Sequence, residues 1–139
     1  MKFSVAFAIG LAALPGLASA SFAATCKDWF WSDRHKFVAT CKKADGTWRR
    51  TRQDMNLCLG RSGDVIVSEN NGKAFESPTA SGKQACIFSH LSGSVLTVGC
   101  NNGMVNLPIN LAPSSIDLNT VLHNGNGFLQ CHGHNGAPY

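Results

Sequence analysis

The five histidines of the chain are its best candidates for acid–base or metal chemistry, but their spacing favours neither. His132 and His134 follow Cys131 in a glycine-rich stretch, where the pattern indicates no more than adventitious metal binding. A general acid–base pair needs a titratable partner in a pocket, yet Asp117 is the sole charged side chain after Lys83. The sequence also lacks Gly-x-Ser-x-Gly, His-Glu-x-x-His and nucleotide-loop motifs. We therefore expect a protein that is not an enzyme and that uses no metal or cofactor.

A basic and aromatic stretch, TWRRTR at 47–52, offers a different chemistry, the binding of anions. Strand alternation would place Arg50 and Arg52 on the same face as Trp48, with Arg49 on the opposite face. Such a face could bind anionic glycans, phosphate or an acidic protein. The alternative is ordinary solvated surface, balanced by nearby aspartates. No nucleic-acid-binding motif is present, so we expect no nucleic-acid partner. The basic set comprises Lys42, Lys43, Arg49, Arg50, Arg52 and Arg61.

The first twenty residues, MKFSVAFAIGLAALPGLASA, have the pattern of a secretory signal peptide. Lys2 precedes an apolar run that glycine and proline interrupt, and Ala18-Ser19-Ala20 is a small-residue cleavage site. A membrane anchor is the alternative, but the run is short and has no basic stop-transfer flank. We therefore expect a secreted, extracellular protein with a single domain at 21–139 and no membrane partner.

All six cysteines lie within 21–139, and an even number in an exported chain favours three disulfides. No Cys-x-x-Cys pair occurs, which argues further against a zinc or thiol-redox site. The number alone allows many connectivities, so it does not fix the pairing. The positions are Cys26, Cys41, Cys58, Cys86, Cys100 and Cys131.

The cysteines also reveal an internal repeat, with one copy at about 21–80 and the other at about 81–131. HKFVATC (35–41) and SVLTVGC (94–100) are alternating, strand-like runs that end at equivalent cysteines. An Asp-Met-Asn phrase at 54–56 returns as Asp-Leu-Asn at 117–119, where a single helical turn capped by Asp117 or Ser115 is expected. Two copies are too few for a solenoid and indicate two pseudo-symmetric halves of an all-β fold. The glycine-rich residues 132–139 are expected to form a flexible tail.

These residues resemble the cyanovirin-N homology (CVNH) family, small two-repeat sugar-binding proteins of cyanobacteria, fungi and some plants. The shared features are the Phe22-x-x-Thr25-Cys26 opening and Ile-Asp-Leu-Asn-x-x-Leu-x-Asn-x-Asn-Gly-x-Leu at 116–129. The resemblance covers the whole of 21–139, and the chain looks like a secreted fungal-type member. The first copy departs from the pattern at 61–64, where Arg-Ser-Gly-Asp replaces Asn-x-Asn/Asp-Gly.

The resemblance implies a strand-exchanged, two-lobed cyanovirin-N-like fold, in which each lobe is a three-stranded sheet completed by a hairpin of the other repeat. Lobe A takes most of repeat one and the hairpin at 124–131, and lobe B takes the middle of the chain. The family's within-repeat disulfides correspond to Cys26–Cys41 and Cys86–Cys100. Cys58 and Cys131 would then both belong to lobe A, so a third bridge between them is expected to favour a monomer over a domain-swapped dimer.

The resemblance also implies a metal-free glycan site near the end of each lobe, with oligomannose as the ligand. Asn124 and Asn126 have an alternative reading as turn residues, because asparagine tolerates left-handed backbone conformations. The polar side chains at the matching positions are Thr25, Lys42, Asn124 and Asn126 in lobe A, and Gln84, Asn101 and Asn102 in lobe B.

The function that follows is that of a non-catalytic, carbohydrate-binding lectin. The alternative is a secreted effector or interaction protein that binds a protein or an anionic polymer through the basic, Trp-rich first half. A small basic hydrolase is a third alternative. In the Trp29-Phe30-Trp31 run, alternation separates Phe30 from the two tryptophans, so we expect at least two of the three rings to pack in the core or between the lobes.

Overall fold

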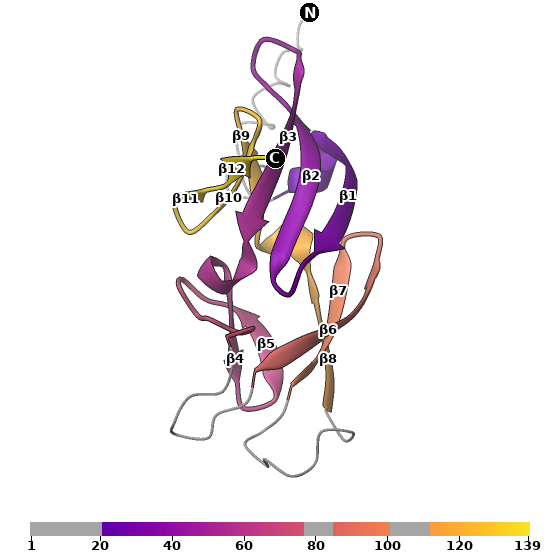
Figure 1. Cartoon of the computed structure of the whole chain (residues 1–139), viewed down its shortest axis with the longest axis vertical. Helices are drawn as coiled ribbons and strands as arrows, with labels where there is room; N and C mark the ends of the chain where they lie inside the picture. Colours follow the sequence, from indigo (N-terminus) through magenta and orange to yellow (C-terminus); the bar gives the residue numbers. More distant parts are fainter. Residues whose placement is uncertain (1–20, 77–84, 101–111) are drawn as a thin grey trace, which may run out of the picture.

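The computed structural model describes residues 21–76, 85–100 and 112–139, which form β-strands joined by turns and three short 3₁₀ helices. Figure 1 shows an elongated molecule with lobe A in its upper part and lobe B in its lower part. Within the residues that the structure describes, no helix has the length and apolar character that a membrane span requires.

Lobe A contains an antiparallel sheet of order β1-β2-β3-β12 and a smaller sheet of order β11-β10-β9. The first three strands come from repeat one, whereas the smaller sheet and β12 come from the end of the chain (Figure 1). The hairpin predicted at 124–131 therefore completes the lobe of repeat one. The strands are β1 (Cys26–Ser32), β2 (Lys36–Lys42), β3 (Trp48–Asp54), β9 (His123–Gly125), β10 (Phe128–Cys131), β11 (His134–Asn135) and β12 (Ala137–Pro138).

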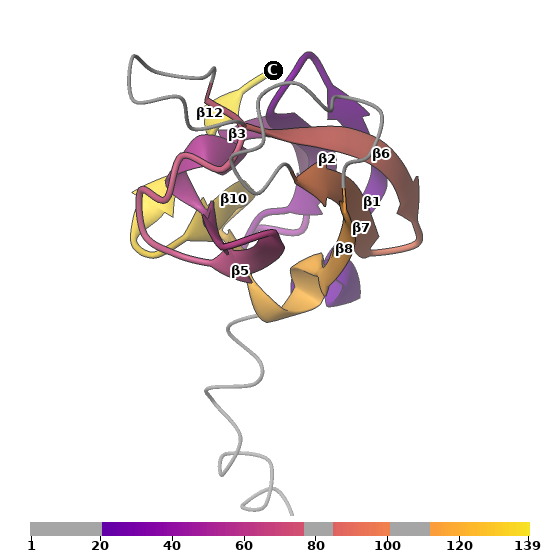
Figure 2. The ribbon, with the colours of Figure 1, turned by 90° about the horizontal axis from the view of Figure 1, so that it is seen from below.

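Lobe B repeats this plan with a sheet of order β6-β7-β8 and a hairpin of β4 and β5 that repeat one supplies. Figure 2, which looks along the molecule from below, shows β5 on one side and the sheet on the other. The strand-exchanged, all-β fold is thus confirmed. The strands are β4 (Leu59–Ser62), β5 (Val65–Ser68), β6 (Cys86–Ser92), β7 (Val95–Cys100) and β8 (Ala112–Asp117).

In each lobe a hydroxyl on the inner face of the sheet holds the exchanged hairpin. The buried Thr51 Oγ1 accepts a hydrogen bond from the Leu129 N–H of β10 at 3.4 Å. Ser114 Oγ accepts one from the Ile66 N–H of β5 at 2.9 Å. Because Thr51 and Ser114 occupy equivalent register positions, opposite Ala39 and Val98, the two lobes use the same device.

The Asp-x-Asn phrases each form a capped 3₁₀ turn, η2 (Met55–Leu57) and η3 (Leu118–Thr120). Asp117 Oδ1 accepts the Asn119 N–H at 3.0 Å, so Asp117 is the cap and Ser115 is not. Ser115 Oγ instead bonds Thr97 Oγ1 across the sheet at 2.8 Å. The turns bury Met55 and Leu118 completely, which anchors the end of each sheet in the core.

The aromatic run in β1 is divided as alternation predicts. Trp31 stacks on Phe88 of lobe B, with ring centroids 5.2 Å apart and an interplanar angle of 8°. The indole N–H of Trp29 donates to the Gly93 carbonyl of lobe B at 2.8 Å. Phe30 lies on the opposite face and remains 36% exposed. The prediction that two of the three rings pack between the lobes is therefore confirmed.

The three expected disulfides are present: Cys26–Cys41, Cys58–Cys131 and Cys86–Cys100. The first and third each join neighbouring strands of one sheet. Cys58–Cys131 spans 73 residues and joins the segment after η2 to the end of β10. Since it links the two repeats within one chain, it fixes the exchange covalently.

The expectation of a flexible tail at 132–139 is corrected by the structure. His134–Asn135 forms β11 on the edge of β10, and Ala137–Pro138 forms β12 on the edge of β3. The buried Gln53 explains why the tail is held: its Nε2 donates to the carbonyls of Leu129 and His134, both at 3.0 Å. A buried amide requires such partners, and the tail supplies one of them.

Candidate functional site

Three chain segments meet at one end of lobe A: Thr25 just before β1, the turn that follows Lys42 at the end of β2, and the tip of the β9–β10 hairpin. The Lys42 N–H donates to the Thr25 carbonyl at 2.9 Å, which joins the first two segments. The hairpin tip is joined to both through Asn124 and Asn126. All four residues predicted for lobe A are therefore neighbours in space, although they span a hundred residues of sequence.

Asn124 is the clamp that holds the three segments together. Its side-chain Nδ2 donates to Thr25 Oγ1 at 3.0 Å and to the Lys42 carbonyl at 2.8 Å. Its Oδ1 accepts the Gly127 N–H at 2.7 Å, which shapes the hairpin turn. Both amide hydrogens are thus engaged, so Asn124 positions the site. Toward a ligand it can still accept a hydrogen bond but cannot donate one.

Asn126 lies at the hairpin tip in a left-handed conformation, with φ of 52°, that asparagine tolerates better than most residues. Its Oδ1 accepts the Ala44 N–H at 2.7 Å, which fixes the amide plane. Its Nδ2 has no hydrogen-bond partner in the described part of the chain, and the residue is exposed. Asn126 therefore combines the turn role with two donors that a ligand can use.

Thr25 and Lys42 carry further polar groups at this end of the lobe, with the Lys42 side chain on the outer face of the sheet, opposite to the face that the hairpin covers. Thr25 is exposed, and its hydroxyl can still donate because Asn124 uses it as an acceptor. The Lys42 ammonium is also exposed, 5.4 Å from the centre of the Trp48 ring. Among the residues that the structure describes, no carboxylate lies within ion-pair distance of Lys42. The site is thus rich in hydrogen-bond donors.

Sequence reasoning missed Asp45, a carboxylate that adds acceptor capacity to this donor-rich end of the lobe. Asp45 is exposed and follows Ala44, whose N–H is bound to Asn126. Its Oδ1 accepts from the hydroxyl and the N–H of Thr47 at 2.6 and 2.9 Å. The Thr47 hydroxyl, followed by the Thr47 N–H, lowers the pKa of Asp45 below its ordinary value, so the carboxylate stays ionised. Asp45 is followed by Gly46, and an Asp-Gly pair is a turn signal that by itself indicates no ligand.

The residues predicted for lobe B cannot be compared in the same way, because Gln84, Asn101 and Asn102 lie outside the described residues. The hairpin of lobe B does differ from that of lobe A. Where lobe A has Asn124 and Asn126, the aligned positions in the β4–β5 hairpin hold Arg61 and Gly63.

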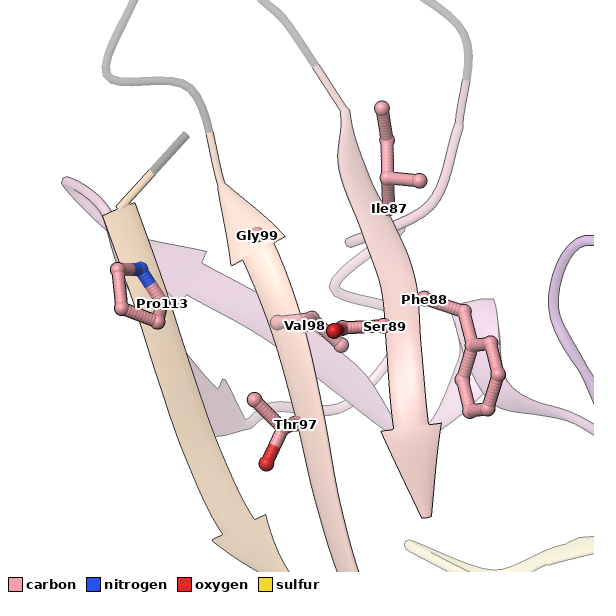
Figure 3. Close-up of a pocket in the computed structure, with 7 residues that line it drawn as sticks. All are labelled: Ile87, Phe88, Ser89, Thr97, Val98, Gly99 and Pro113. Atoms are coloured by element: carbon pink, nitrogen blue, oxygen red, sulfur yellow. The ribbon is translucent and has the colours of Figure 1, made fainter. Parts of the chain in front are cut away.

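A shallow hollow of about 290 Å³ lies on the outer face of the lobe B sheet. Figure 3 shows that Thr97 and Gly99 of β7 lie between Ile87 on β6 and Pro113 on β8. None of the described residues that line it is charged; its side-chain hydroxyls are those of Ser89 and Thr97, and the Thr97 hydroxyl is bonded to Ser115. It offers apolar contact but few hydrogen bonds for a sugar.

The histidines form no catalytic or metal-binding cluster in the described part of the chain. His132 bonds the Ser68 hydroxyl at 3.1 Å, and His134 bonds Asn70 at 2.8 Å. His35 bonds Asp54 at 2.9 Å, and Lys36 lies 3.4 Å from the same carboxylate. No group of three His, Cys, Asp or Glu side chains within the described ranges is arranged to hold a metal ion.

Asp54 is committed to structure, since it caps η2 through the Asn56 N–H at 3.0 Å. Partial burial raises the pKa of Asp54, but the Asn56 N–H, the Lys36 ammonium and His35 together lower it by a larger amount. The net pKa lies below the ordinary value, so Asp54 is ionised at neutral pH and is a poor proton acceptor.

Two pseudo-symmetric lobes with exchanged hairpins and a polar end define a class of small, disulfide-stabilised, all-β binding proteins. The chain belongs to the CVNH domain family, whose model matches residues 22–130. This is a lectin family whose members are non-catalytic, which agrees with the expectation that the chain is not an enzyme. No curated protein matches the chain.

Solved structures agree with this fold at low sequence identity. The CVNH protein of Gibberella zeae is 16% identical with a TM-score of 0.58, and the match covers 81% of this chain and 97% of that one. A MoCVNH3 variant in complex with (N-GlcNAc)4 is 14% identical with a TM-score of 0.62, covering 79% and 95% of the two chains. Microvirin in complex with mannobiose is 18% identical with a TM-score of 0.53, covering 80% and 97%.

Proposed function

We propose that the chain is a secreted lectin that binds a neutral glycan of the oligomannose type at the end of lobe A. The observation that carries this proposal is the convergence of Thr25, Lys42 and Asn126 around the amide clamp of Asn124. Sugar hydroxyls each donate and accept hydrogen bonds, so they need close-set groups of both kinds. Membership of a lectin family and two solved relatives with bound sugars support the same function.

Each residue of the site has its own role. The Asn126 amide and the Thr25 hydroxyl donate to sugar oxygens, and the Lys42 ammonium adds a stronger, charge-assisted donor. The free oxygen of the Asp45 carboxylate accepts from sugar hydroxyls. Asn124 is a positioning residue, because its amide hydrogens are bound to Thr25 and Lys42. Trp48, which is 44% exposed beside Lys42, offers a ring for contact with sugar C–H groups.

Asn126→Asp is the sharpest test of this site. The aspartate keeps the oxygen that accepts the Ala44 N–H and tolerates the same left-handed backbone, but it removes both free donors. We expect the affinity for oligomannose, measured by titration calorimetry, to fall about tenfold while the melting temperature is unchanged. Asn71→Asp is the matched control, since Asn71 is also exposed and has φ of 56°.

Chitotetraose is titrated in parallel, because one relative was solved with (N-GlcNAc)4. Tighter binding of chitotetraose than of oligomannose, with the same sensitivity to Asn126→Asp, would keep the site and replace the ligand. If Asn126→Asp bound both glycans as the unaltered protein does, the assignment of the site to this end of lobe A would be wrong.

Secretion and a monomeric state complete the proposal. Expression of the full chain in a eukaryotic secretion host is expected to release a protein that begins at Ser21, as read by N-terminal sequencing. Light scattering is expected to give the mass of one chain, because Cys58–Cys131 closes the strand exchange intramolecularly. Retention of residues 1–20 on the secreted protein, or a stable dimer, would contradict these two points respectively.

A further inference from the structure

The outer face of the β1-β2-β3-β12 sheet carries a row of cations and aromatic rings, which we call the basic face. Cross-strand pairing puts its members on one side: Lys27 and Arg50 flank Thr40, Lys42 pairs with Trp48, and Arg52 lies across Val38 from Phe30. Side chains at alternate positions of β3 are about 7 Å apart, so the row from Trp48 to Arg52 extends over roughly 13 Å. The members are Lys27, Lys42, Arg50 and Arg52, with Phe30, Trp48 and Tyr139 between them.

Aromatic rings, and not carboxylates, hold these cations in place. The Lys27 ammonium lies 4.1 Å from the centre of the Trp48 ring. The Arg50 guanidinium lies 5.3 Å from the Phe30 ring and 5.4 Å from the Tyr139 ring, and that of Arg52 lies 5.2 Å from the Tyr139 ring. Such contacts orient a cation without neutralising its charge.

None of the four cations is neutralised by an ion pair in the described part of the chain. The ion pairs found there involve His35 and Lys36 with Asp54, at the far end of β3. Asp28, the neighbour of Lys27 in sequence, makes no ion pair with it. A cluster of like charges without counter-ions costs free energy through self-repulsion, and an anionic ligand relieves that cost.

The equivalent face of lobe B shows that the fold does not require these charges. The register places Ile87 where lobe A has Lys27, Pro113 where it has Arg50 and Ser115 where it has Arg52. That face holds the hollow of Figure 3, and none of the described residues that line it is charged. The basic face is therefore a property of one lobe and is independent of strand pairing.

We infer that the basic face binds a polyanionic glycan, an extended sugar chain that carries carboxylate or sulfate groups, alongside the neutral-glycan site at the end of the lobe. Arginine forks bind planar carboxylates in bidentate fashion and also bind sulfate oxygens, while the sheet offers a straight, open track for an extended chain. Nucleic acid fits less well, because single-stranded binding relies on free ring faces for base stacking, and here the rings already carry cations.

The test compares Arg50→Gln/Arg52→Gln with Arg34→Gln/Lys73→Gln, a pair that removes the same charge from exposed positions off the basic face. Binding of the secreted full-chain product to immobilised heparin and to polygalacturonate is measured by biolayer interferometry at 50 and 300 mM NaCl, with neutral dextran and single-stranded DNA as further arms. The heparin arm reports on sulfate recognition and the polygalacturonate arm on carboxylate recognition.

We expect at least one of the two polysaccharides to bind, and its affinity to fall more than tenfold from low to high salt. Arg50→Gln/Arg52→Gln is expected to lose about tenfold at 50 mM NaCl, and the control pair less than twofold. An equal loss of affinity in both variants would overturn the inference, because it would show that binding depends on net charge and not on a defined face. Tighter binding of DNA than of either polysaccharide would overturn the choice of a glycan.

The outcome is separable from that of the proposed function. Lys42 and Trp48 belong to both surfaces, whereas Arg50 and Arg52 are not part of the site at Asn126, so the double variant is expected to bind oligomannose like the unaltered protein. Failure of polyanion binding would leave the neutral-glycan site intact, and failure at Asn126 would leave the basic face intact.

Discussion

Lobe A and lobe B share an interior and differ in their outer surfaces. Inside, the correspondence is close: Thr51 matches Ser114 as the hydroxyl that holds the exchanged hairpin, and Asp54 matches Asp117 as the cap of a 3₁₀ turn. Outside, the sheet of lobe A carries arginine where the sheet of lobe B carries proline and serine. The same strand plan thus supports a basic sheet surface on lobe A, whereas the described strands of the lobe B sheet carry no lysine or arginine.

The difference teaches that the repeat encodes the scaffold and that each copy carries its own surface. Inner-face positions are constrained by packing and buried hydrogen bonds, so their chemistry persists in both halves. Outer-face positions contact solvent and can change without loss of the fold. Lobe A also differs in one inner position, Gln53, whose equivalent in lobe B is Ile116. Substitutions at matched positions of the two lobes test how much each of these contrasts contributes to stability.

Removal of the disulfides is expected to produce the largest effects on stability, and these effects should differ from one bridge to another. Replacing both Cys58 and Cys131 by alanine is expected to lower the free energy of unfolding by about 4 kcal/mol, because that bridge spans 73 residues. Replacing Cys86 and Cys100 should cost about 3 kcal/mol, since their separation is 14 residues. Urea unfolding under non-oxidising, non-reducing conditions measures both values.

The bridge Cys26–Cys41 serves as the control, because it belongs to lobe A but spans only 15 residues. Its removal should cost about as much as that of Cys86–Cys100. An equal cost for all three bridges would show that the span across the strand exchange is not what matters.

Gln53→Met tests the polar inner position that lobe B lacks. Methionine has a similar volume but removes the amide donor to the part-buried His134 carbonyl and leaves the Leu129 carbonyl with the Gly136 N–H alone, so we expect a loss of about 2 kcal/mol. Hydrogen exchange at the Gly136 and Ala137 amides should also accelerate, because the tail is held by these bonds. Ile116→Met in lobe B should cost less than about 1.5 kcal/mol and leave the tail protected. Unchanged exchange in Gln53→Met would mean that strand pairing alone retains the tail.

The caps of the two 3₁₀ turns, Asp54 and Asp117, are expected to show the smallest difference in stability between the lobes. Asn is also a good cap, so Asp54→Asn removes the charge interactions with His35 and Lys36 while keeping the turn, and should cost about 0.5–1 kcal/mol at pH 7. Because the pKa of Asp54 is lowered in the folded state, its ionised form stabilises the fold above its ordinary value of 3.8, and this contribution is lost as the pH falls through the lower folded pKa.

The stability difference between the unaltered protein and Asp54→Asn should therefore vanish on acidification toward pH 2, as followed by melting temperature against pH. Asp117→Asn is the matched control, since Asp117 forms no ion pair in the described residues. A pH-independent difference for Asp54→Asn would contradict the charge explanation.

The sequence predicts those parts of the fold that rest on local chemistry. The cysteine spacing, the Asp-x-Asn turns and the division of Trp29 and Trp31 from Phe30 follow from short-range patterns and recur in the structure. The pairing of Cys58 with Cys131 needed the resemblance to a known family, because the two lie at non-equivalent points of the repeat.

Long-range hydrogen bonds account for what sequence reasoning missed. Gln53 and Leu129 are 76 residues apart, so nothing local shows that a polar side chain in β3 holds the tail. Asn124 and Lys42 are 82 residues apart, which is why the sequence could not show that the Asn124 donors are already used. Alternation places side chains on faces of a strand, but it does not identify the partner across the fold.

An amide chemical-shift titration of the protein with oligomannose tests the central claim most directly. We predict that the largest shifts fall on Thr25, on 42–45 and on 125–127, the segments that Asn124 and Asn126 bring together, and that Arg50, Arg52 and the tail at 132–139 respond little. Saturable binding with no shift in those three segments would contradict the assignment of the glycan site to this end of lobe A.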